Sequence, residues 1–138
     1  MPLFLCNKKG LIMNISCGTD IIEINRIEKA IENSEERFLT KVFTKKEIEY
    51  CESKHKVKYQ HYAARFAAKE AVYKALNNII EGSCSISWQN IEIINNEKGK
   101  PEVSLKNINL ENIISIDISL SHCKEYAIAN AVVLYNKN

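Results

Sequence analysis

The amino-acid sequence predicts an α+β domain in which an antiparallel sheet packs against helices. Three observations support this fold class: 138 residues suit one core, helical patterns come first, and hairpin-linked strand patterns come last. Helices followed by such strands favour α+β over an alternating α/β fold. We expect the domain to span residues 13 to 138, with residues 1 to 12 as an N-terminal extension.

The first expected element is a strand. Residues 13 to 17 alternate between apolar and polar side chains, which predicts a half-buried strand that ends at Gly18 and joins the sheet. Asn25 and Glu28 then have the spacing of a capping box, so we expect the first helix to begin there.

Three further helical segments are expected. A short one surrounds Phe38, and another begins at Thr44, which has Glu47 three residues later in a second capping-box pattern. The strongest helix covers residues 59 to 76, which are rich in alanine and contain no Gly or Pro. Its apolar residues recur at helical steps, and its alanines allow a neighbouring backbone to come close.

The last third of the chain has the period of strands. Residues 91 to 93 and 103 to 105 form a hairpin around the turn NNEKGKP. Isoleucine and leucine alternate with serine and aspartate over residues 114 to 120, which predicts one buried and one exposed face. The apolar run over residues 126 to 135 predicts a final strand buried on both faces.

Composition excludes several classes of protein. An apolar share of 46% and a charged share of 26% are those of a globular chain, and no apolar run approaches the roughly 20 residues that span a bilayer. Five widely spaced cysteines predict free thiols in a reducing cytoplasm. A basic stretch before the longest helix fits either a solvated face or a docking surface for an acidic partner. It consists of Lys41, Lys45, Lys46, Lys54, Lys56 and Lys58.

Two carboxylates are candidates for a metal site. Asp20 follows the expected strand end, where a short side chain on ordered backbone suits a hard cation, although a turn or helix cap also explains it. Glu70 borders the apolar face of the longest helix, where burying a carboxylate is costly unless it is paired or metal-bound. Lys74 lies one turn later, so a surface ion pair is the alternative for Glu70.

A third candidate is His122, which ends the alternating strand in the motif SLSH. A histidine at this position is either a site residue or a hydrogen-bonded turn residue. The sequence contains no HExxH helix, Walker loop or nucleophile elbow, which excludes the enzyme classes that those motifs mark.

Four motifs make the chain similar to the holo-acyl-carrier-protein synthases, the short single-domain type of the 4′-phosphopantetheinyl transferase superfamily. They are GTDIIEINRI (18 to 27), ARFAAKEAVYKAL (64 to 76), IEIINNEKGKP (91 to 101) and SLSHCKEYAIANAVV (119 to 133). The resemblance implies an enzyme of fatty acid biosynthesis that moves the 4′-phosphopantetheine group of coenzyme A to a serine of apo acyl carrier protein and releases adenosine 3′,5′-bisphosphate. It also implies a requirement for Mg²⁺ and a homotrimer with active sites between subunits.

The resemblance assigns roles to individual residues. Asp20 and Glu70 fall on the metal-binding carboxylates and, with Lys74, on the catalytic set. The segments around the coenzyme A nucleotide and phosphates contain Arg65, Lys69, Lys74 and His122. Arg26 matches a position that touches the acidic carrier, and Arg37 and Lys41 extend this basic surface.

The chemistry of phosphoryl transfer is consistent with these roles. Negative charge builds on the phosphate oxygens, and Mg²⁺ neutralises it with only one or two protein carboxylates because substrate and water supply the other ligands. Lys74 lies one helical turn beyond Glu70, so it can stabilise the same charge. The serine proton can pass to Asp20, Glu70 or a metal-bound water, and all three remain open.

One segment departs from the family pattern, and two other functions compete with the transferase. In place of a glycine-rich loop after the longest helix, the chain has Asn77 and Asn78, either of which tolerates a left-handed turn. The broader transferases that serve synthase complexes have two similar halves, for which this chain is too short. A binding module for an acidic protein or RNA explains the basic stretch, but the central carboxylates argue against a nucleic-acid surface. We therefore expect neither a nucleic-acid nor a membrane partner.

Overall fold

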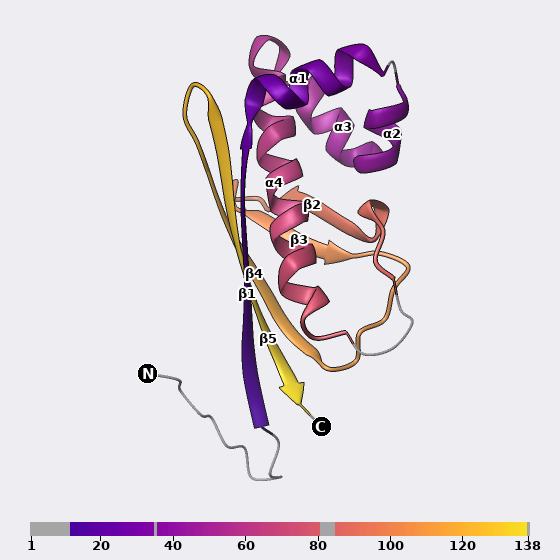
Figure 1. Ribbon diagram of the computed structural model, residues 1–138, viewed down its shortest axis with the longest axis vertical. Helices are drawn as coiled ribbons and strands as arrows, with labels where there is room; N and C mark the ends of the chain where they lie inside the picture. Colours follow the sequence, from indigo (N-terminus) through magenta and orange to yellow (C-terminus); the bar gives the residue numbers. More distant parts are fainter. Residues whose placement is uncertain (1–11, 35, 81–84, 138) are drawn as a thin grey trace.

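The computed structural model describes residues 12–34, 36–80 and 85–137 as helices packed on antiparallel strands (Figure 1). The helices are α1 (Ile24–Asn33), α2 (Arg37–Val42), α3 (Lys45–Glu52) and α4 (Lys58–Asn77), with short 3-10 turns at His55–Val57 and Trp88–Asn90. The strands are β1 (Ile12–Glu23), β2 (Ile91–Asn95), β3 (Pro101–Leu105), β4 (Ile113–His122) and β5 (Tyr126–Lys137). The expected α+β class is confirmed.

The strands form two antiparallel groups. β1, β5 and β4 lie in that order in a three-stranded sheet, so the first and last strands of the chain pair along their whole length. β2 and β3 form a separate hairpin, where we had expected one sheet, and this hairpin contacts α4 and β4. Figure 1 shows α4 running beside the long sheet while α1, α2 and α3 gather at one end.

The contact between β1 and α4 is unusually close because both elements present small residues. A Cβ added to Gly18 would lie 2.0 Å from the carbonyl oxygen of Ala71, so no other residue fits there without movement. The Ser16 hydroxyl donates to the carbonyl oxygen of Ala75 at 2.7 Å. The expected close approach of a neighbouring backbone to the alanine face is confirmed.

The beginning of the chain differs from the prediction at two points. β1 does not end at Gly18 but continues to Glu23, because every residue of this stretch pairs with β5. Glycine at position 18 marks a close backbone approach rather than a strand end. The capping box at Asn25 is also wrong, since α1 begins at Ile24 and its N-cap residue makes no side-chain hydrogen bond.

The sheet is buried on one face only. β5 alternates between buried residues such as Ala129 and exposed ones such as Ile128, so its expected burial on both faces is wrong. In β4 a register shift between Ile113 and Ser115 turns Ile114 outward, which departs from the strict alternation. The helices cover the inner face and leave the outer face uncovered by any described residue.

Several predictions about the helices are confirmed. Thr44 and Glu47 form a reciprocal capping box at the start of α3, and α4 covers the predicted alanine-rich segment. The left-handed turn at Asn77 or Asn78 is wrong, because Asn77 is helical and Asn78 has a right-handed φ of −73°.

The remaining expectations concern the ends, the thiols and the membrane. Of the expected N-terminal extension, residues 1 to 11 lie outside the described residues, and Ile12 belongs to β1. Cys17, Cys51 and Cys123 are free thiols. No helix in the described ranges is long and apolar enough to cross a membrane.

Candidate active site

Asp20 and Glu70 come together in a groove between β1 and α4. Asp20 lies on the inward face of β1, in step with Ser16 and Gly18, and Glu70 lies on α4 one residue before Ala71. Both carboxylates line a groove of about 460 Å³, and Phe66 and Arg26 line it as well. The close approach at Gly18 therefore sets the position of Asp20 relative to Glu70.

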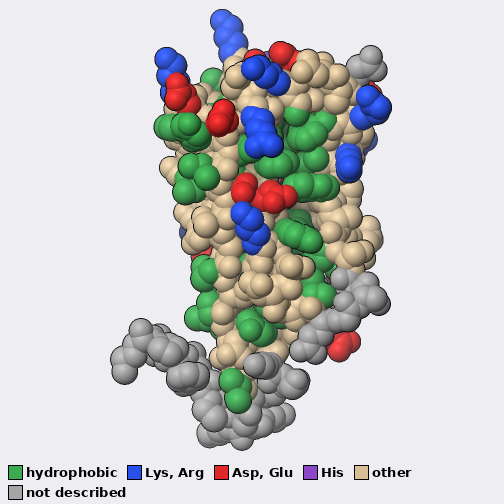
Figure 2. Space-filling view, viewed as in Figure 1, with side chains coloured by type: hydrophobic (Ala, Val, Ile, Leu, Met, Phe, Trp, Pro, Cys, Tyr) green, Lys and Arg blue, Asp and Glu red, His purple; other side chains and the backbone are tan. Residues whose placement is uncertain are grey.

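The electrostatics of the pair leave negative charge uncompensated. Burial, and then the negative charge of Asp20, raise the pKa of Glu70, while Lys74 partly opposes the rise. Lys74 Nζ donates to Asp20 Oδ1 at 3.1 Å and to the carbonyl oxygen of Thr19 at 3.0 Å. One lysine therefore offsets the negative charge of two carboxylates. Figure 2 shows an acidic patch near the middle of the viewed face, with basic side chains beside it.

This donor set suits a magnesium ion. Mg²⁺ prefers oxygen ligands and takes only one or two protein carboxylates when substrate phosphates and water complete its shell. The described residues contain no group of three or more His, Cys, Asp or Glu side chains that would form a closed metal site. The residues present fit a cation shared with a phosphate substrate, because the raised pKa of Glu70 marks charge that a cation would neutralise.

Arg65 and His122 lie in a different hollow. This basic pocket of about 300 Å³ also contains His61, Asn95 and Lys100, and it shares no lining residue with the groove at Asp20. Arg65 and Glu70 are five residues apart on α4, which separates them by about 140° around the helix. One chain therefore does not bring all predicted site residues together.

The basic pocket has unpaired hydrogen-bonding capacity. Arg65 Nη2 donates to Asn95 Oδ1 at 3.2 Å, and the guanidinium stacks on Tyr50 with Cζ 3.9 Å from the ring centre. Arg65 Nε is buried and has no hydrogen-bond partner. Burial and the nearby charges of Arg65, Lys54 and His122 lower the pKa of His61. Such a pocket attracts anions.

Lys69 does not fit the nucleotide-contacting role expected for it. Its side chain is fully buried, and its ammonium pairs with Glu47 at 2.6 Å. Lys69 Nζ also donates to the carbonyl oxygens of Val42 at 2.7 Å and Trp88 at 3.0 Å. Glu47 in turn accepts from the backbone of Ile93 at 2.8 Å. This buried ion pair ties α4 to α3 and β2, so its charges are satisfied within the chain.

The three residues expected to contact the carrier lie on neighbouring helices. Arg26 is exposed on α1 and lines the groove that contains Asp20 and Glu70. Arg37 and Lys41 are exposed on α2, which contacts α1. A basic surface therefore borders the carboxylate pair.

Several residues that line pockets near the candidate site were not predicted from the sequence. Tyr73 and Trp88 line a pocket beside Glu70, while Tyr50 and Asn95 line the basic pocket. Asn95 belongs to the motif IEIINNEKGKP and stands at the end of β2, a position that signals a polar site residue. The aromatic residues could not be recognised as site residues from the sequence, because their pattern is equally typical of a hydrophobic core.

Comparison with known proteins supports the same interpretation. The sequence profile of the 4′-phosphopantetheinyl transferase superfamily matches residues 16–131. The chain belongs to this superfamily. Among relatives named holo-[acyl-carrier-protein] synthase, that of Ruminiclostridium cellulolyticum is 50% identical over 88% of this chain and 92% of its own length. The protein of that name from Protochlamydia amoebophila is 47% identical over 87% of this chain and 98% of its own length.

Solved structures agree. The holo-[acyl-carrier-protein] synthase of Helicobacter pylori in complex with coenzyme A has a TM-score of 0.71 and 34% identity, covering 85% of this chain and 98% of that one. The Bacillus anthracis synthase in complex with CoA (3′,5′-ADP) also has a TM-score of 0.71 and 34% identity, covering 89% of this chain and 98% of that one. The predicted resemblance to the short synthases is confirmed.

Proposed function

We propose that this chain is a holo-acyl-carrier-protein synthase, which transfers the 4′-phosphopantetheine group of coenzyme A to a serine of apo acyl carrier protein in fatty acid biosynthesis. Adenosine 3′,5′-bisphosphate is the other product. The observation that carries the proposal is the Asp20–Glu70 pair in an open groove, on a chain with synthase relatives over most of its length.

Asp20 and Glu70 would hold the Mg²⁺, which supplies charge neutralisation for the pyrophosphate when bound. Lys74 holds the Asp20 carboxylate at one oxygen and adds a positive charge beside the reacting phosphates. The serine hydroxyl must lose a proton, and the two carboxylates are the acceptors that this groove offers. Arg26, on the same groove, would orient the acidic carrier, and Arg37 and Lys41 would extend that surface.

We also propose that the working form is a homotrimer with shared active sites. The outer sheet face exposes Ile15, Ile21 and Ile128, with relative exposures of 59%, 62% and 44%, and such an apolar face favours burial against another subunit. Arg65, which lies about 140° around α4 from Glu70, and His122, at the end of β4, line a pocket apart from the groove at Asp20. They would therefore bind the nucleotide for a neighbouring subunit. Sedimentation equilibrium measures the assembly, and a monomer at assay concentration would exclude it.

The decisive test is the mass of a purified apo carrier after incubation with coenzyme A. We expect the added mass of phosphopantetheine with Mg²⁺ and none with a chelator. Asp20→Asn and Glu70→Gln should each slow the reaction by at least about a hundredfold, whereas the exposed control Glu111→Gln should not. Wild-type rates in either variant would refute the metal assignment, and an unmodified carrier with the wild-type protein would refute the function.

A further inference from the structure

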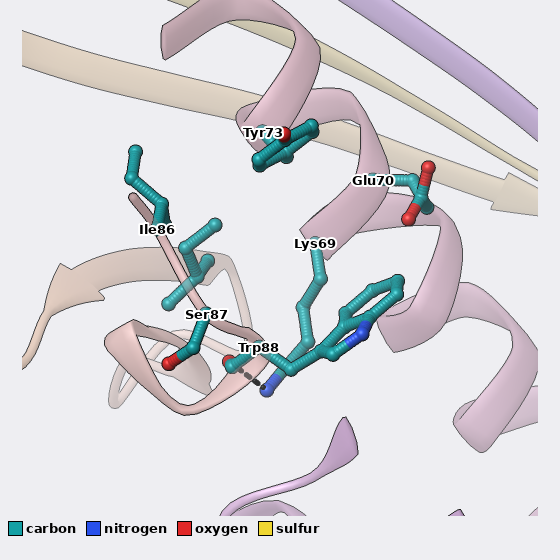
Figure 3. A pocket seen from close by; sticks show the side chains of 7 residues that line it. Lys69, Glu70, Tyr73, Ile86, Ser87 and Trp88 are labelled. Atoms are coloured by element: carbon teal, nitrogen blue, oxygen red, sulfur yellow. Dashed lines mark hydrogen bonds between the residues drawn. The ribbon is translucent and has the colours of Figure 1, made fainter. Parts of the chain in front are cut away.

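The longest helix, α4, directs two cationic side chains into the protein, and only one of them is neutralised there. Arg65 and Lys69 lie one helical turn apart and are 2% and 0% exposed. Lys69 pairs with Glu47, and it also donates to the carbonyl oxygen of Trp88, a bond that Figure 3 shows as a dashed line. Arg65 forms no ion pair with an Asp or Glu of the described residues. Its charge is therefore held by other means.

An aromatic ring and an amide hold the Arg65 guanidinium. Arg65 Cζ lies 3.9 Å from the centre of the Tyr50 ring, which comes from α3. Arg65 Nη2 donates to Asn95 Oδ1 at 3.2 Å, and Asn95 Nδ2 donates to the Tyr50 hydroxyl oxygen at 3.0 Å. The three side chains thus form a closed ring of contacts that joins α3, α4 and β2, so the position of the guanidinium is set before any ligand arrives.

This way of holding Arg65 keeps its charge available. The face of an aromatic ring attracts a guanidinium without accepting its N–H groups in the manner of an anion. Asn95 accepts only one N–H, and Arg65 Nε is buried without a hydrogen-bond partner. A carboxylate in the place of Tyr50 would instead neutralise the guanidinium and accept two of its N–H groups. Tyr50 therefore fixes Arg65 and leaves its positive charge for an anion.

Tyr50 is also the common neighbour of other basic groups. Lys54 Nζ lies 4.8 Å from the centre of the Tyr50 ring. The His61 imidazole meets the same ring at an angle of 76°, with ring centres 5.6 Å apart. None of the described residues that line the basic pocket is an Asp or Glu. The surroundings of Tyr50 therefore favour an anionic ligand over a cationic one.

We propose that Tyr50 is a positioning residue for coenzyme A, whose ring holds the Arg65 guanidinium in the orientation that binds a phosphate of the nucleotide. This inference rests on the proposed function, which places the nucleotide in the basic pocket. It adds a residue that lies outside all four sequence motifs. Tyr50 acts through Arg65, so its loss should weaken nucleotide binding and leave the chemical step unchanged.

A double-mutant cycle tests whether Tyr50 acts through Arg65, with adenosine 3′,5′-bisphosphate as the ligand in calorimetric titrations. Tyr50→Leu should bind the bisphosphate about tenfold more weakly than wild type, because the contact between the ring and the guanidinium is lost. Arg65→Ala should bind at least about tenfold more weakly, and adding Tyr50→Leu to it should change the affinity by less than about twofold. Tyr50→Phe keeps the ring and should stay within about threefold of wild type.

Steady-state kinetics separate positioning from a general loss of structure. In the carrier assay, Tyr50→Leu should raise the KM for coenzyme A and leave kcat unchanged, which is the signature of lost binding alone. Tyr59→Leu is the matched control, because Tyr59 is also half-buried and has Lys58 Nζ 5.3 Å from its ring centre, but it does not line the basic pocket. This variant should keep the wild-type affinity and KM.

Four results would overturn the inference. They are no loss of affinity in Tyr50→Leu, the same loss with and without Arg65, an equal loss in Tyr59→Leu, and a Tyr50→Phe variant as weak as Tyr50→Leu. If the wild-type protein binds the bisphosphate and modifies the carrier in these cases, only the role of Tyr50 fails. If the wild-type protein does neither, the proposed function fails as well.

Discussion

Replacing Gly18 by alanine should separate the two carboxylates of the candidate site. The new Cβ would lie 2.0 Å from the carbonyl oxygen of Ala71, and Cβ contacts under 3.0 Å essentially do not occur. β1 and α4 must therefore move apart by about 1 Å at this point, which costs about 1–3 kcal/mol as overpacking. Loss of the hydrogen bond between Ser16 and Ala75 would add about 1 kcal/mol.

The same movement should lower activity, because Asp20 lies two residues from Gly18 on the same face of β1. A misplacement of about 1 Å at a reacting centre costs on the order of a hundredfold in rate. Urea unfolding measures the stability, and the mass of the apo carrier over time measures the rate.

The control for Gly18→Ala is a variant with similar destabilisation in a different part of the core. Ile93→Ala, at a fully buried position of β2, should lose about 2–5 kcal/mol and keep its rate under conditions where both variants are folded. If Gly18→Ala matches wild type in stability and rate, the close approach does not position Asp20, and the reasoning is wrong.

Three further predictions concern residues around the site. Lys69→Met should lower the unfolding free energy, measured in urea, by about 3–5 kcal/mol, because it leaves the carboxylate of Glu47 buried without its cation. Adding Glu47→Gln should restore part of the lost stability. A Lys69→Met variant as stable as wild type would contradict the structural role of the ion pair. Arg26→Glu should raise the KM for the carrier about tenfold and leave the KM for coenzyme A unchanged. The control Lys29→Glu, on the same helix, should not raise the KM for the carrier in this way. Equal effects of Arg26→Glu on both substrates would exclude a docking role. The pKa of His61 is lowered from 6.5 in the folded state. The folded protein therefore binds the imidazole proton less tightly than the unfolded chain does, and the unfolding free energy should fall as pH drops below about 6.5. The fall should be smaller in His61→Asn, and an identical pH profile would refute the contribution of His61.

Periodicity was enough to predict the fold class but not how residues are used in three dimensions. The alternation in β4 and the alanine face of α4 led to the correct elements, because each pattern matches one local geometry. Gly18 was misinterpreted, since a glycine that ends a strand and a glycine that admits a helix backbone are identical in sequence. The expected burial of β5 on both faces was wrong for a related reason. In the sequence, apolar side chains on an uncovered sheet face cannot be distinguished from buried ones.

Motifs located the carboxylates better than any local pattern did. Asp20 and Glu70 were ambiguous one by one, and their common groove depends on a contact between segments 50 residues apart in the numbering. Lys69 shows the limit of a motif: it stands beside Glu70 in sequence, yet its helical position directs it into the core, where Glu47 neutralises it. The partner of a buried charge is not visible from spacing alone.

The proposed function requires Asp20 and Glu70 to act together on one cation and one phosphate. The most direct test is the rate of carrier modification by Asp20→Asn, Glu70→Gln and the double variant, at saturating Mg²⁺ and coenzyme A. Groups that act as a unit are not additive, so we expect the double variant to be no slower than the slower single variant. If the two losses multiply instead, the carboxylates act independently, and the shared site is refuted.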